Sequence, residues 1–253
     1  MHPVLVKLGP ITMYSYGVMV ALGFGLAAFL ISRHARRLGM SPEKIVDMVV
    51  VILISGIIGA RILYILLNPG YYLSNPAEIF DLSKGGLVWY GGFIASIIAA
   101  IVYIKVNKLN FWIVMDLIVP YVALAQVFGR IGCFLNGCCY GIQAPAGFPC
   151  GVTFPGSSVL RHPAEIYSSM ILLFIYMILR AWQELPHFKG EIFLGYCLLY
   201  SSKRFGIEFL RGDNPRAYFG LTISQVISLT VLITAFIIFI RKRVEWKKYL
   251  QSK

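Results

Sequence analysis

Long apolar runs are the feature that most constrains the fold of this chain. Seven such runs lie at residues 12–31, 45–67, 87–104, 111–129, 163–180, 190–206 and 220–240. Each approaches the ~20 residues that a helix needs to cross ~30 Å of hydrocarbon. The alternation of apolar and polar residues that is typical of membrane β-barrels is absent. We therefore predict an all-α integral membrane protein with about seven transmembrane helices.

Composition and connections agree with a membrane protein. Hydrophobic residues make up 58% of the 253 residues and charged residues only 13%, against roughly 25% charged in a soluble domain. The runs are joined by short connections without a linker, a repeat or a low-complexity tract. Residues 1–253 are therefore expected to form a single polytopic domain whose first run is an uncleaved helix, since no small-residue cleavage site follows it.

The distribution of Lys and Arg predicts the orientation. Clusters at residues 33–37 and 241–248 fall on one side of the membrane, and the other side carries fewer basic residues, among them Lys84 and Arg216. Because cytoplasmic loops carry the excess, we expect the N-terminus outside and the C-terminus in the cytoplasm. The net charge of +12 then serves attraction to anionic membrane lipids, and nucleic acid is not an expected partner.

Several polar side chains stand where apolar ones are expected. Arg61 lies within the second run, where a charge costs about 2.5–3.5 kcal/mol even on the lenient insertion scale. It either reaches toward the outer headgroups or lines a hydrated cavity. Tyr16 and Tyr90, near the outer ends of the first and third runs, are either interfacial aromatics or site residues.

A glycine-rich motif, GRIGCFLNGCCYG, closes the fourth run. Arg130 stands there among glycines that end at Gly141, with Asn136 between them. An arginine beside exposed backbone N–H groups is suited to bidentate binding of a phosphate. The alternative is a glycine-rich helix end capped by an outer arginine.

Two further motifs carry charge at the outer face. Arg204, Glu208 and Arg211 are spaced i, i+4, i+7 and share one helical face, as a structural ion-pair ladder or as an anion site. In RHPAEIYSS, Arg161 and His162 precede the fifth run. His162 is a candidate general base because its ordinary pKa is near ~6.5, or else a hydrogen-bonding fixture.

The cysteines leave two alternatives open. Cys133, Cys138, Cys139 and Cys150 lie outside in this topology, where an oxidising medium would allow a disulfide from Cys138 or Cys139 to Cys150. A metal site is not expected, because no second pair at ligand spacing accompanies the adjacent cysteines.

Taken in order, the motifs resemble those of the bacterial prolipoprotein diacylglyceryl transferases over almost the whole chain. They are LGPITMYSYG, GARILY, GGLVWYGGFIAS, GRIGCFLNGCCYG, RHPAEIY, KRFGIEFLRGD and LTISQVIS. The family also has seven spans with the N-terminus outside. Single motifs are weak signals, but seven in the right order identify the chain as a member.

The resemblance implies a reaction and its partners. The diacylglyceryl group of phosphatidylglycerol would pass to the lipobox cysteine of a prolipoprotein signal peptide, forming a thioether and releasing glycerol phosphate. The enzyme would act in the bacterial plasma membrane with no metal or diffusible cofactor. The implied site residues fall into two groups. Arg130, Arg204, Glu208, Tyr90 and His162 are the catalytic candidates, and Arg130, Tyr16, Arg61, Asn136, Gly141, Arg161 and Arg211 are the substrate-binding candidates.

Within the resemblance, the sequence departs from the family pattern. Tyr90 replaces a frequent histidine, and a tyrosine with an ordinary pKa near ~10 is a poor general base. Cys133 and Cys138 replace a frequent asparagine and a frequent acidic residue, and Glu165 replaces a frequent glutamine. The departures mark either a subfamily of the same enzyme or a paralogous phospholipid-dependent transferase with another acceptor. A lipid transporter that uses the same arginine-lined cavity is a further alternative.

Overall fold

The computed structural model describes residues 1–8, 11–81, 85–145, 147–156, 158–214 and 220–252. Lys84 and Arg216 lie outside the described residues. Contacts divide the chain into two compact units, unit 1 with residues 1–30 and 115–253 and unit 2 with residues 31–114. The units are described separately below, and a single domain stays a prediction.

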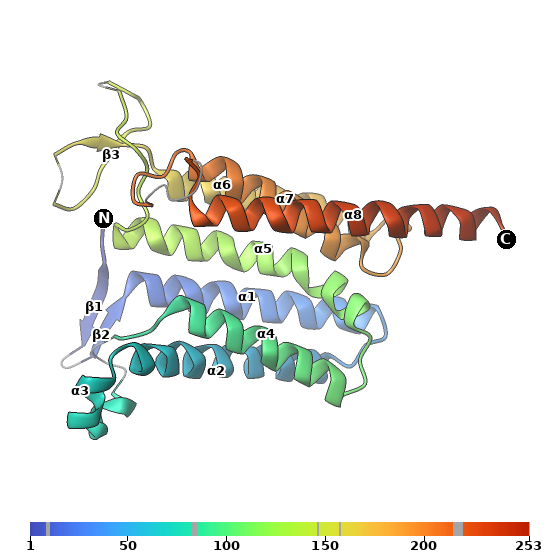
Figure 1. The fold of residues 1–253 in the computed structure, drawn as a ribbon, viewed down its shortest axis with the longest axis horizontal. Coiled ribbons are helices and arrows are strands. Elements are labelled where there is room, and N and C mark those ends of the chain that lie inside the picture. Colours follow the sequence, from blue (N-terminus) through green and yellow to red (C-terminus); the bar gives the residue numbers. More distant parts are fainter. Residues whose placement is uncertain (9–10, 82–84, 146, 157, 215–219, 253) are drawn as a thin grey trace. The chain divides into compact units, whose positions relative to one another are not determined.

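Helices form most of both units, in the order that Figure 1 traces. Helices α1 and α5 each belong partly to both units. Unit 2 also holds α2 (Pro42–Leu67), α3 (Pro69–Ser74), the 3₁₀ helix η1 (Pro76–Phe80) and α4 (Trp89–Val106). Unit 1 holds β1 (Val4–Leu8), β2 (Ile11–Tyr14), α1 (Ser15–Arg37), α5 (Phe111–Asn136), β3 (Val152–Thr153), β4 (Leu160–Arg161), α6 (Ala164–Gln183), α7 (Glu191–Glu208) and α8 (Ile223–Gln251).

Within the described residues, six helices are long and apolar enough to cross a membrane: α1, α2, α4, α5, α6 and α8. They coincide with six of the seven predicted runs. The protein is thus an all-α, multi-pass membrane protein. The remaining predicted run forms α7, which carries four charged residues, Glu191, Lys203, Arg204 and Glu208, and is not among the six.

The start of the first run was predicted wrongly. The structure places Ile11–Tyr14 in strand β2, antiparallel to β1, and α1 begins only at Ser15. The Ser15 backbone N–H donates to the Pro3 carbonyl at 2.9 Å. Hydropathy does not distinguish these apolar strand residues from the first turn of a helix.

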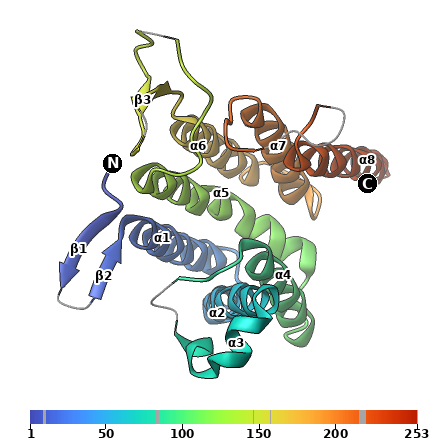
Figure 2. The same ribbon diagram turned by 60° about the vertical axis from the view of Figure 1, so that its left-hand side comes forward.

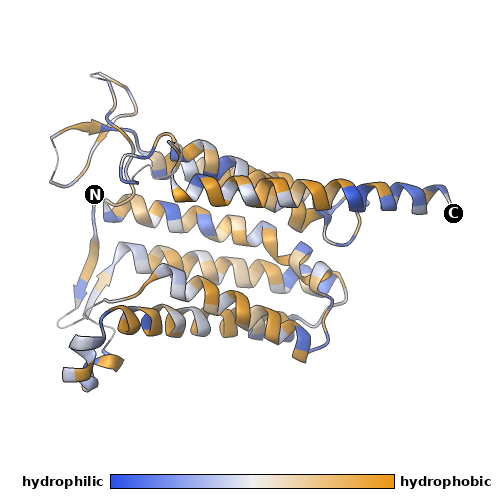
Figure 3. Cartoon of the chain, viewed as in Figure 1, coloured by the Kyte–Doolittle hydropathy of each residue, from blue (hydrophilic) through white to orange (hydrophobic). Residues whose placement is uncertain are grey.

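The surfaces of the spanning helices are apolar, as Figure 3 shows. Large side chains such as Leu66, Ile98 and Phe174 are more than half exposed. Exposure of this kind is expected where lipid, rather than water, covers the helix. The last turns of α8 are hydrophilic and carry the basic cluster 241–248 (Figure 3).

In unit 2, small residues bring α2 and α4 into close contact. A Cβ atom on Gly59 would lie 2.3 Å from the Ala95 Cβ and 2.6 Å from the Gly91 carbonyl oxygen. The Ser96 hydroxyl donates to the Ile52 carbonyl at 3.1 Å. Close approach at small residues is the usual way in which helices associate in lipid. The glycines of α2 and the small residues of α4 therefore form one contact surface.

Arg61, in α2, organises the segment that follows the second span. Its guanidinium is buried and donates five hydrogen bonds, to the carbonyls of Ile79 (3.0 Å), Gly85 (3.0 Å), Gly86 (3.2 Å), Glu78 (2.6 Å) and Asp81 (2.9 Å). A guanidinium has five N–H donors, so all are engaged. The sequence offered two interpretations of Arg61, that it reaches toward the lipid headgroups or that it lines a hydrated cavity. The structure shows a third arrangement, in which Arg61 binds backbone carbonyls of the protein.

We expect Arg61→Lys to lower the melting temperature of the purified protein by several degrees. A lysine offers three donors on one nitrogen, so some of the part-buried carbonyls lose their partner, at about 1 kcal/mol for each hydrogen bond lost. Thermal unfolding in detergent measures the change, with the exposed Arg37→Lys as the matched control. An unchanged melting temperature together with lost lipid binding would contradict the structural role and favour a headgroup contact.

In unit 1, the carbonyl and the carboxylate of Asp116, in α5, bind the end of α6 and the start of α7. Pro120 lies inside α5 and cannot donate to the carbonyl four residues earlier. That carbonyl, of Asp116, instead accepts a 2.6 Å hydrogen bond from Gln183 Nε2 at the end of α6. The Asp116 carboxylate also accepts from the backbone N–H groups of Gly190 (2.5 Å) and Phe193 (2.8 Å). A carboxylate from α5 therefore caps the N-terminus of α7.

Helices α6, α7 and α8 run side by side in unit 1 (Figures 1 and 2). The N-terminus of α8 carries a capping box, in which the Thr222 hydroxyl accepts from the Gln225 N–H and the Gln225 side chain accepts from the Thr222 N–H. A capping box fixes where a helix begins. The same two residues join the start of α8 to the end of α7, because the Thr222 hydroxyl donates to Glu208 at 2.9 Å and Gln225 Nε2 donates to the Phe205 carbonyl at 3.5 Å.

Candidate functional site

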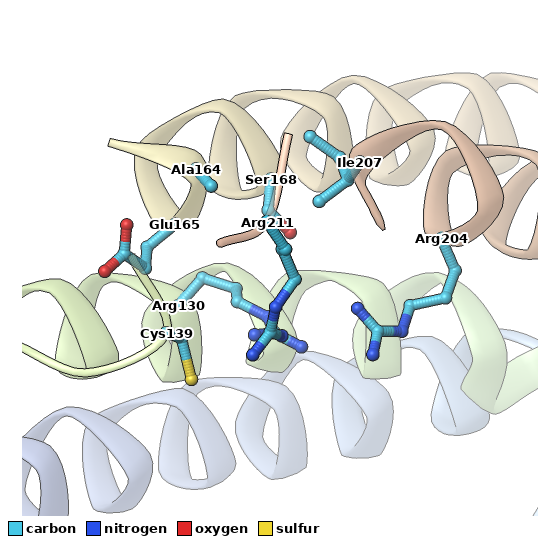
Figure 4. A pocket seen from close by; sticks show the side chains of 8 residues that line it. All are labelled: Arg130, Cys139, Ala164, Glu165, Ser168, Arg204, Ile207 and Arg211. Carbon is cyan, nitrogen blue, oxygen red and sulfur yellow. The ribbon is translucent and has the colours of Figure 1, made fainter. Parts of the chain in front are cut away.

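A pocket in unit 1 gathers most of the charged motifs. The pocket is narrow, with a cavity volume of about 10 Å³, which is room for about one water molecule. Its lining residues come from α5, α6, α7 and the segments that follow α5 and α7: Arg130, Cys139, Ala164, Glu165, Ser168, Arg204, Ile207 and Arg211. In Figure 4 the three arginine side chains reach into the space between α5, α6 and α7.

The three arginines differ in their partners. Arg204 Nη1 lies 2.8 Å from Glu208 Oε2, and Arg204 Nη2 donates to the Ser224 hydroxyl at 2.8 Å. Arg211 binds Asp213 through two hydrogen bonds, of 2.8 and 2.5 Å. Arg130 has no hydrogen-bond or ion-pair partner among the described residues. The pocket therefore contains two arginines that are paired with carboxylates and one arginine, Arg130, whose guanidinium is left to bind an anionic group.

The two carboxylate oxygens of Glu208 are used differently: Oε1 accepts hydrogen bonds, whereas the buried Oε2 is in ion-pair contact with Arg204 and accepts no hydrogen bond from the described residues. Besides Arg204, its carboxylate accepts from Asn214 Nδ2 at 2.5 Å and from the Thr222 hydroxyl at 2.9 Å. These bonds tie the end of α7 to the start of α8 and orient Arg204. The i, i+4, i+7 trio is thus not one ladder, because Arg211 pairs with Asp213 rather than with Glu208.

Gly141 positions Arg211 through the backbone. The Ile142 N–H donates to the Leu210 carbonyl at 2.8 Å, and Gly141 forms a β-bridge with Arg211. A Cβ atom on Gly141 would lie 2.5 Å from the His162 carbonyl oxygen and 2.9 Å from the Leu210 carbonyl oxygen. Only glycine permits such an approach. Gly141 therefore joins the segment after α5 to the one after α7, which carries Arg211.

Glu165 is the unexpected member of the pocket. Its side chain is 1% exposed, and neither carboxylate oxygen has a hydrogen-bond partner in the described part of the chain. Ser168, one helical turn further along α6, also lines the pocket with a buried and unpartnered hydroxyl. Burying unpaired polar groups costs free energy, so these two residues offer hydrogen-bonding capacity to a ligand.

Cys139 lies beside Arg130 in the pocket and belongs to a group of thiols. The Sγ atoms of Cys133, Cys138 and Cys139 all lie within 4.8 Å of one another. Hydrogen bonds from Cys133 and Cys138 hold the pKa of the Cys139 thiol well below its ordinary value, and the positive charges of Arg211 and Arg130 add to the shift. All five cysteines are free, and the exposed Cys150 is not part of the group.

Two predicted residues are engaged beside the pocket and do not line it. Arg161 lies over the Tyr140 ring, 4.5 Å from its centroid, and donates to the Gly141 carbonyl at 3.4 Å. The His162 ring is 4.7 Å from that of Phe148, and its Nδ1 is 3.4 Å from the Tyr167 hydroxyl. For His162 the geometry agrees with the hydrogen-bonding alternative.

The remaining predicted residues are spread over both units. Tyr16 opens α1 in contact with Gly132, where a Cβ atom would lie 3.3 Å from Tyr16 Cα. Asn136 is exposed at the end of α5. Tyr90, in unit 2, is 58% exposed and packs edge-on against Trp89 with 5.3 Å between ring centroids.

Sequence reasoning missed Glu165, Ser168 and Cys139 as pocket residues. Glu165 had a usable signal, since a carboxylate in the first turn of an apolar helix is expensive. Ser168 had none, because an isolated serine in a membrane helix is common. Cys139 depended on the path of the chain after α5, which local patterns do not describe.

Known proteins are similar in sequence to this chain along nearly its whole length. The family described as prolipoprotein diacylglyceryl transferase matches residues 3–241. A phosphatidylglycerol–prolipoprotein diacylglyceryl transferase of Clostridium tetani is 37% identical over 94% of this chain and 97% of its own. The protein of Clostridium perfringens named as transferase 2 is 34% identical over the full length of both, and that of Enterococcus faecalis is 33% identical over 94% and 89%. The chain therefore belongs to the prolipoprotein diacylglyceryl transferase family.

Proposed function

We propose that the protein transfers the diacylglyceryl group of phosphatidylglycerol to the lipobox cysteine of prolipoproteins in the bacterial plasma membrane. The observation that carries the proposal is the unpaired Arg130 in a pocket with Arg204 and Arg211. Relatives at 33–37% identity are named for this reaction. The pocket supplies the positive charge that a phosphate leaving group requires.

In the proposed complex, Arg130 holds the phosphate of phosphatidylglycerol through its guanidinium fork. Preorganised cations stabilise charge that develops on a leaving group, and their effect is larger where water is excluded. Arg204 and Arg211 are already held by Glu208 and Asp213, so they add positive potential without reorganising. The glycerol headgroup carries hydroxyl donors that the unpartnered carboxylate of Glu165 is suited to accept.

The proposed topology includes α7 as a seventh crossing. Its 18 residues span about 27 Å as a helix, close to the hydrocarbon thickness. Its charges lie at its two ends, with Glu191 at one and Lys203, Arg204 and Glu208 at the other. Glu191 pairs with Arg243, whose basic neighbours suit the cytoplasmic side. With seven crossings and a cytoplasmic C-terminus, the proposed topology has the N-terminus outside and the pocket at the outer face.

The acceptor thiol must lose its proton, and the predicted bases do not suit that task. Glu208 has its carboxylate engaged by Arg204, Asn214 and Thr222. His162 does not line the pocket. Tyr90 is a tyrosine, which is a weak base at neutral pH. Thiol activation is therefore the step that these residues leave open.

The test is direct transfer by the purified protein. The full chain in detergent is incubated with phosphatidylglycerol and a peptide that carries one lipobox cysteine, and mass spectrometry records the peptide mass. We expect a diacylglyceryl adduct on the thiol and release of glycerol phosphate. A peptide in which serine replaces the cysteine is the control. Retention of phosphatidylglycerol without any adduct would contradict the acceptor assignment and favour a paralogous transferase or a lipid transporter.

A further inference from the structure

Three thiols meet at the end of α5 without forming a disulfide. Cys133 lies in the last turn of α5, and Cys138 and Cys139 follow it. Their Sγ atoms are all within 4.8 Å of one another, and all three cysteines are free. A disulfide would account for two converging thiols but not for the third.

The backbone turns sharply to bring the thiols together. Gly137 has a φ of 77° and Cys139 a φ of 69°, both in the left-handed region. The turn is closed by hydrogen bonds from the Gly137 N–H to the Phe134 carbonyl (3.1 Å) and from the Cys138 N–H to the Cys133 carbonyl (3.2 Å). A non-glycine residue in this region costs about 1–3 kcal/mol and persists only where its surroundings hold it. The turn therefore directs the thiols of Cys138 and Cys139 back toward Cys133.

The spacing of the sulfurs suits a thiophilic divalent cation. Zinc binds thiolates at ~2.3 Å, so that two sulfurs in a tetrahedral site lie roughly 3.8 Å apart. Sulfurs already within 4.8 Å of one another reach this spacing through small side-chain rotations. No other His, Cys, Asp or Glu of the described chain joins the three as a ligand. Three protein ligands with an open fourth position are typical of catalytic rather than structural zinc sites.

Charge and location add independent support. Three thiolates around a divalent cation leave a net negative charge. Arg130 lines the pocket together with Cys139, and because Arg211 is already paired with Asp213, Arg130 is the arginine that faces that charge. Cys139 thus places one edge of the thiol group in the pocket where the phosphate is proposed to bind (Figure 4).

We propose that Cys133, Cys138 and Cys139 bind a thiophilic divalent cation, zinc by preference, whose open coordination position receives the acceptor thiol. The role in the reaction rests on the proposed function. The metal-binding site itself does not. Zinc binding would activate the acceptor thiol directly, without proton transfer to Glu208, His162 or Tyr90.

The step balances without a further reagent. The acceptor S–H releases its proton to water and binds the cation as a thiolate, since metal coordination favours deprotonation of a thiol. The sulfur then attacks the glycerol carbon that bears the phosphate oxygen. The carbon–oxygen bond breaks, and its electron pair leaves with glycerol phosphate, which Arg130 holds. The thioether product is a weak ligand and departs.

The first experiment measures metal binding without reference to activity. The full-length protein in detergent is stripped with a chelator and titrated with Co²⁺, whose thiolate complexes absorb strongly in the near ultraviolet. We expect one cation per chain, displaced by Zn²⁺, and loss of the signal in Cys133→Ala, Cys138→Ala and Cys139→Ala. Cys150→Ala, at an exposed cysteine outside the group, should bind as the wild type does.

Two results would overturn the site. One is a wild-type protein that binds no more cation than Cys139→Ala, while both remain monodisperse and folded. The other is a disulfide between two of the three cysteines in protein isolated without reductant, detected by mass spectrometry after alkylation. Protection of the three thiols from a maleimide by Zn²⁺, with Cys150 still reactive, would support the site even in a variant of low stability.

The second experiment separates the site from the reaction. Zinc removal is expected to lower transfer to the lipobox peptide by about 100-fold or more, as loss of thiol activation would, and added Zn²⁺ should restore it. Bound phosphatidylglycerol should be retained in both states. Equal transfer with and without zinc would overturn the catalytic role and leave the function intact. Stoichiometric zinc binding with no transfer in any state would instead contradict the proposed function.

Discussion

Arg130→Ala is expected to lower diacylglyceryl transfer by about 10²–10³-fold, the usual cost of removing one preorganised donor to a developing negative charge. The guanidinium of Arg130 has no partner among the described residues, so its removal breaks no ion pair of the protein. The melting temperature should therefore stay near that of the wild type. Initial rates of adduct formation by mass spectrometry measure the loss.

Two further variants sharpen the test of Arg130. Arg130→Lys keeps the charge but loses the bidentate fork, so an intermediate rate is expected. Arg241→Ala removes an exposed arginine in the last turns of α8 and should leave the rate unchanged. Transfer by a folded Arg130→Ala protein within a few-fold of the wild-type rate would mean that another group holds the phosphate.

Glu208→Ala is expected to have the largest effect on stability, a loss of about 3–5 kcal/mol, the range for breaking a buried ion pair from one side. The Glu208 side chain is fully buried and joins Arg204 to Asn214 and Thr222. Without it, Arg204 keeps a largely buried charge with no carboxylate. Thermal unfolding of the purified protein in detergent should show a large fall in melting temperature, accompanied by loss of transfer.

A second i, i+4 pair offers the matched control. Arg180 and Glu184 also form an ion pair, at 3.1 Å, but the Glu184 side chain is 68% exposed. Exposed pairs contribute about 0–1 kcal/mol, so Glu184→Ala should change the melting temperature little. Equal effects of the two variants would mean that the Glu208 network does not hold α7 to α8.

The sequence predicted the membrane class and most helices because the requirement is local. Any apolar run of sufficient length must satisfy its own backbone hydrogen bonds in lipid, and a helix does so within the run. Six of the predicted runs accordingly coincide with spanning helices. The exception at residues 12–14 is instructive. Those residues pair with β1, and strand pairing depends on a partner segment that hydropathy does not include.

The sequence also identified the motifs that supply the pocket, since Arg130, Arg204 and Arg211 were all expected site residues. It did not identify their partners. Whether an arginine is free or neutralised depends on the side chains that the fold brings to it. Arg61 shows this most clearly, because its five acceptors lie 17 to 25 residues away in a segment without a distinctive pattern.

By itself, then, the sequence determined a helical membrane protein with arginines near the ends of its apolar runs, because hydropathy and charge are properties of single residues and short runs. The tertiary structure alone decided which charges are compensated. It left Arg130 unpaired and Glu165 buried without a partner, and it brought Cys133 within 4.8 Å of Cys138 and Cys139. These outcomes depend on backbone turns and on contacts between separate helices, and neither is encoded in a local pattern.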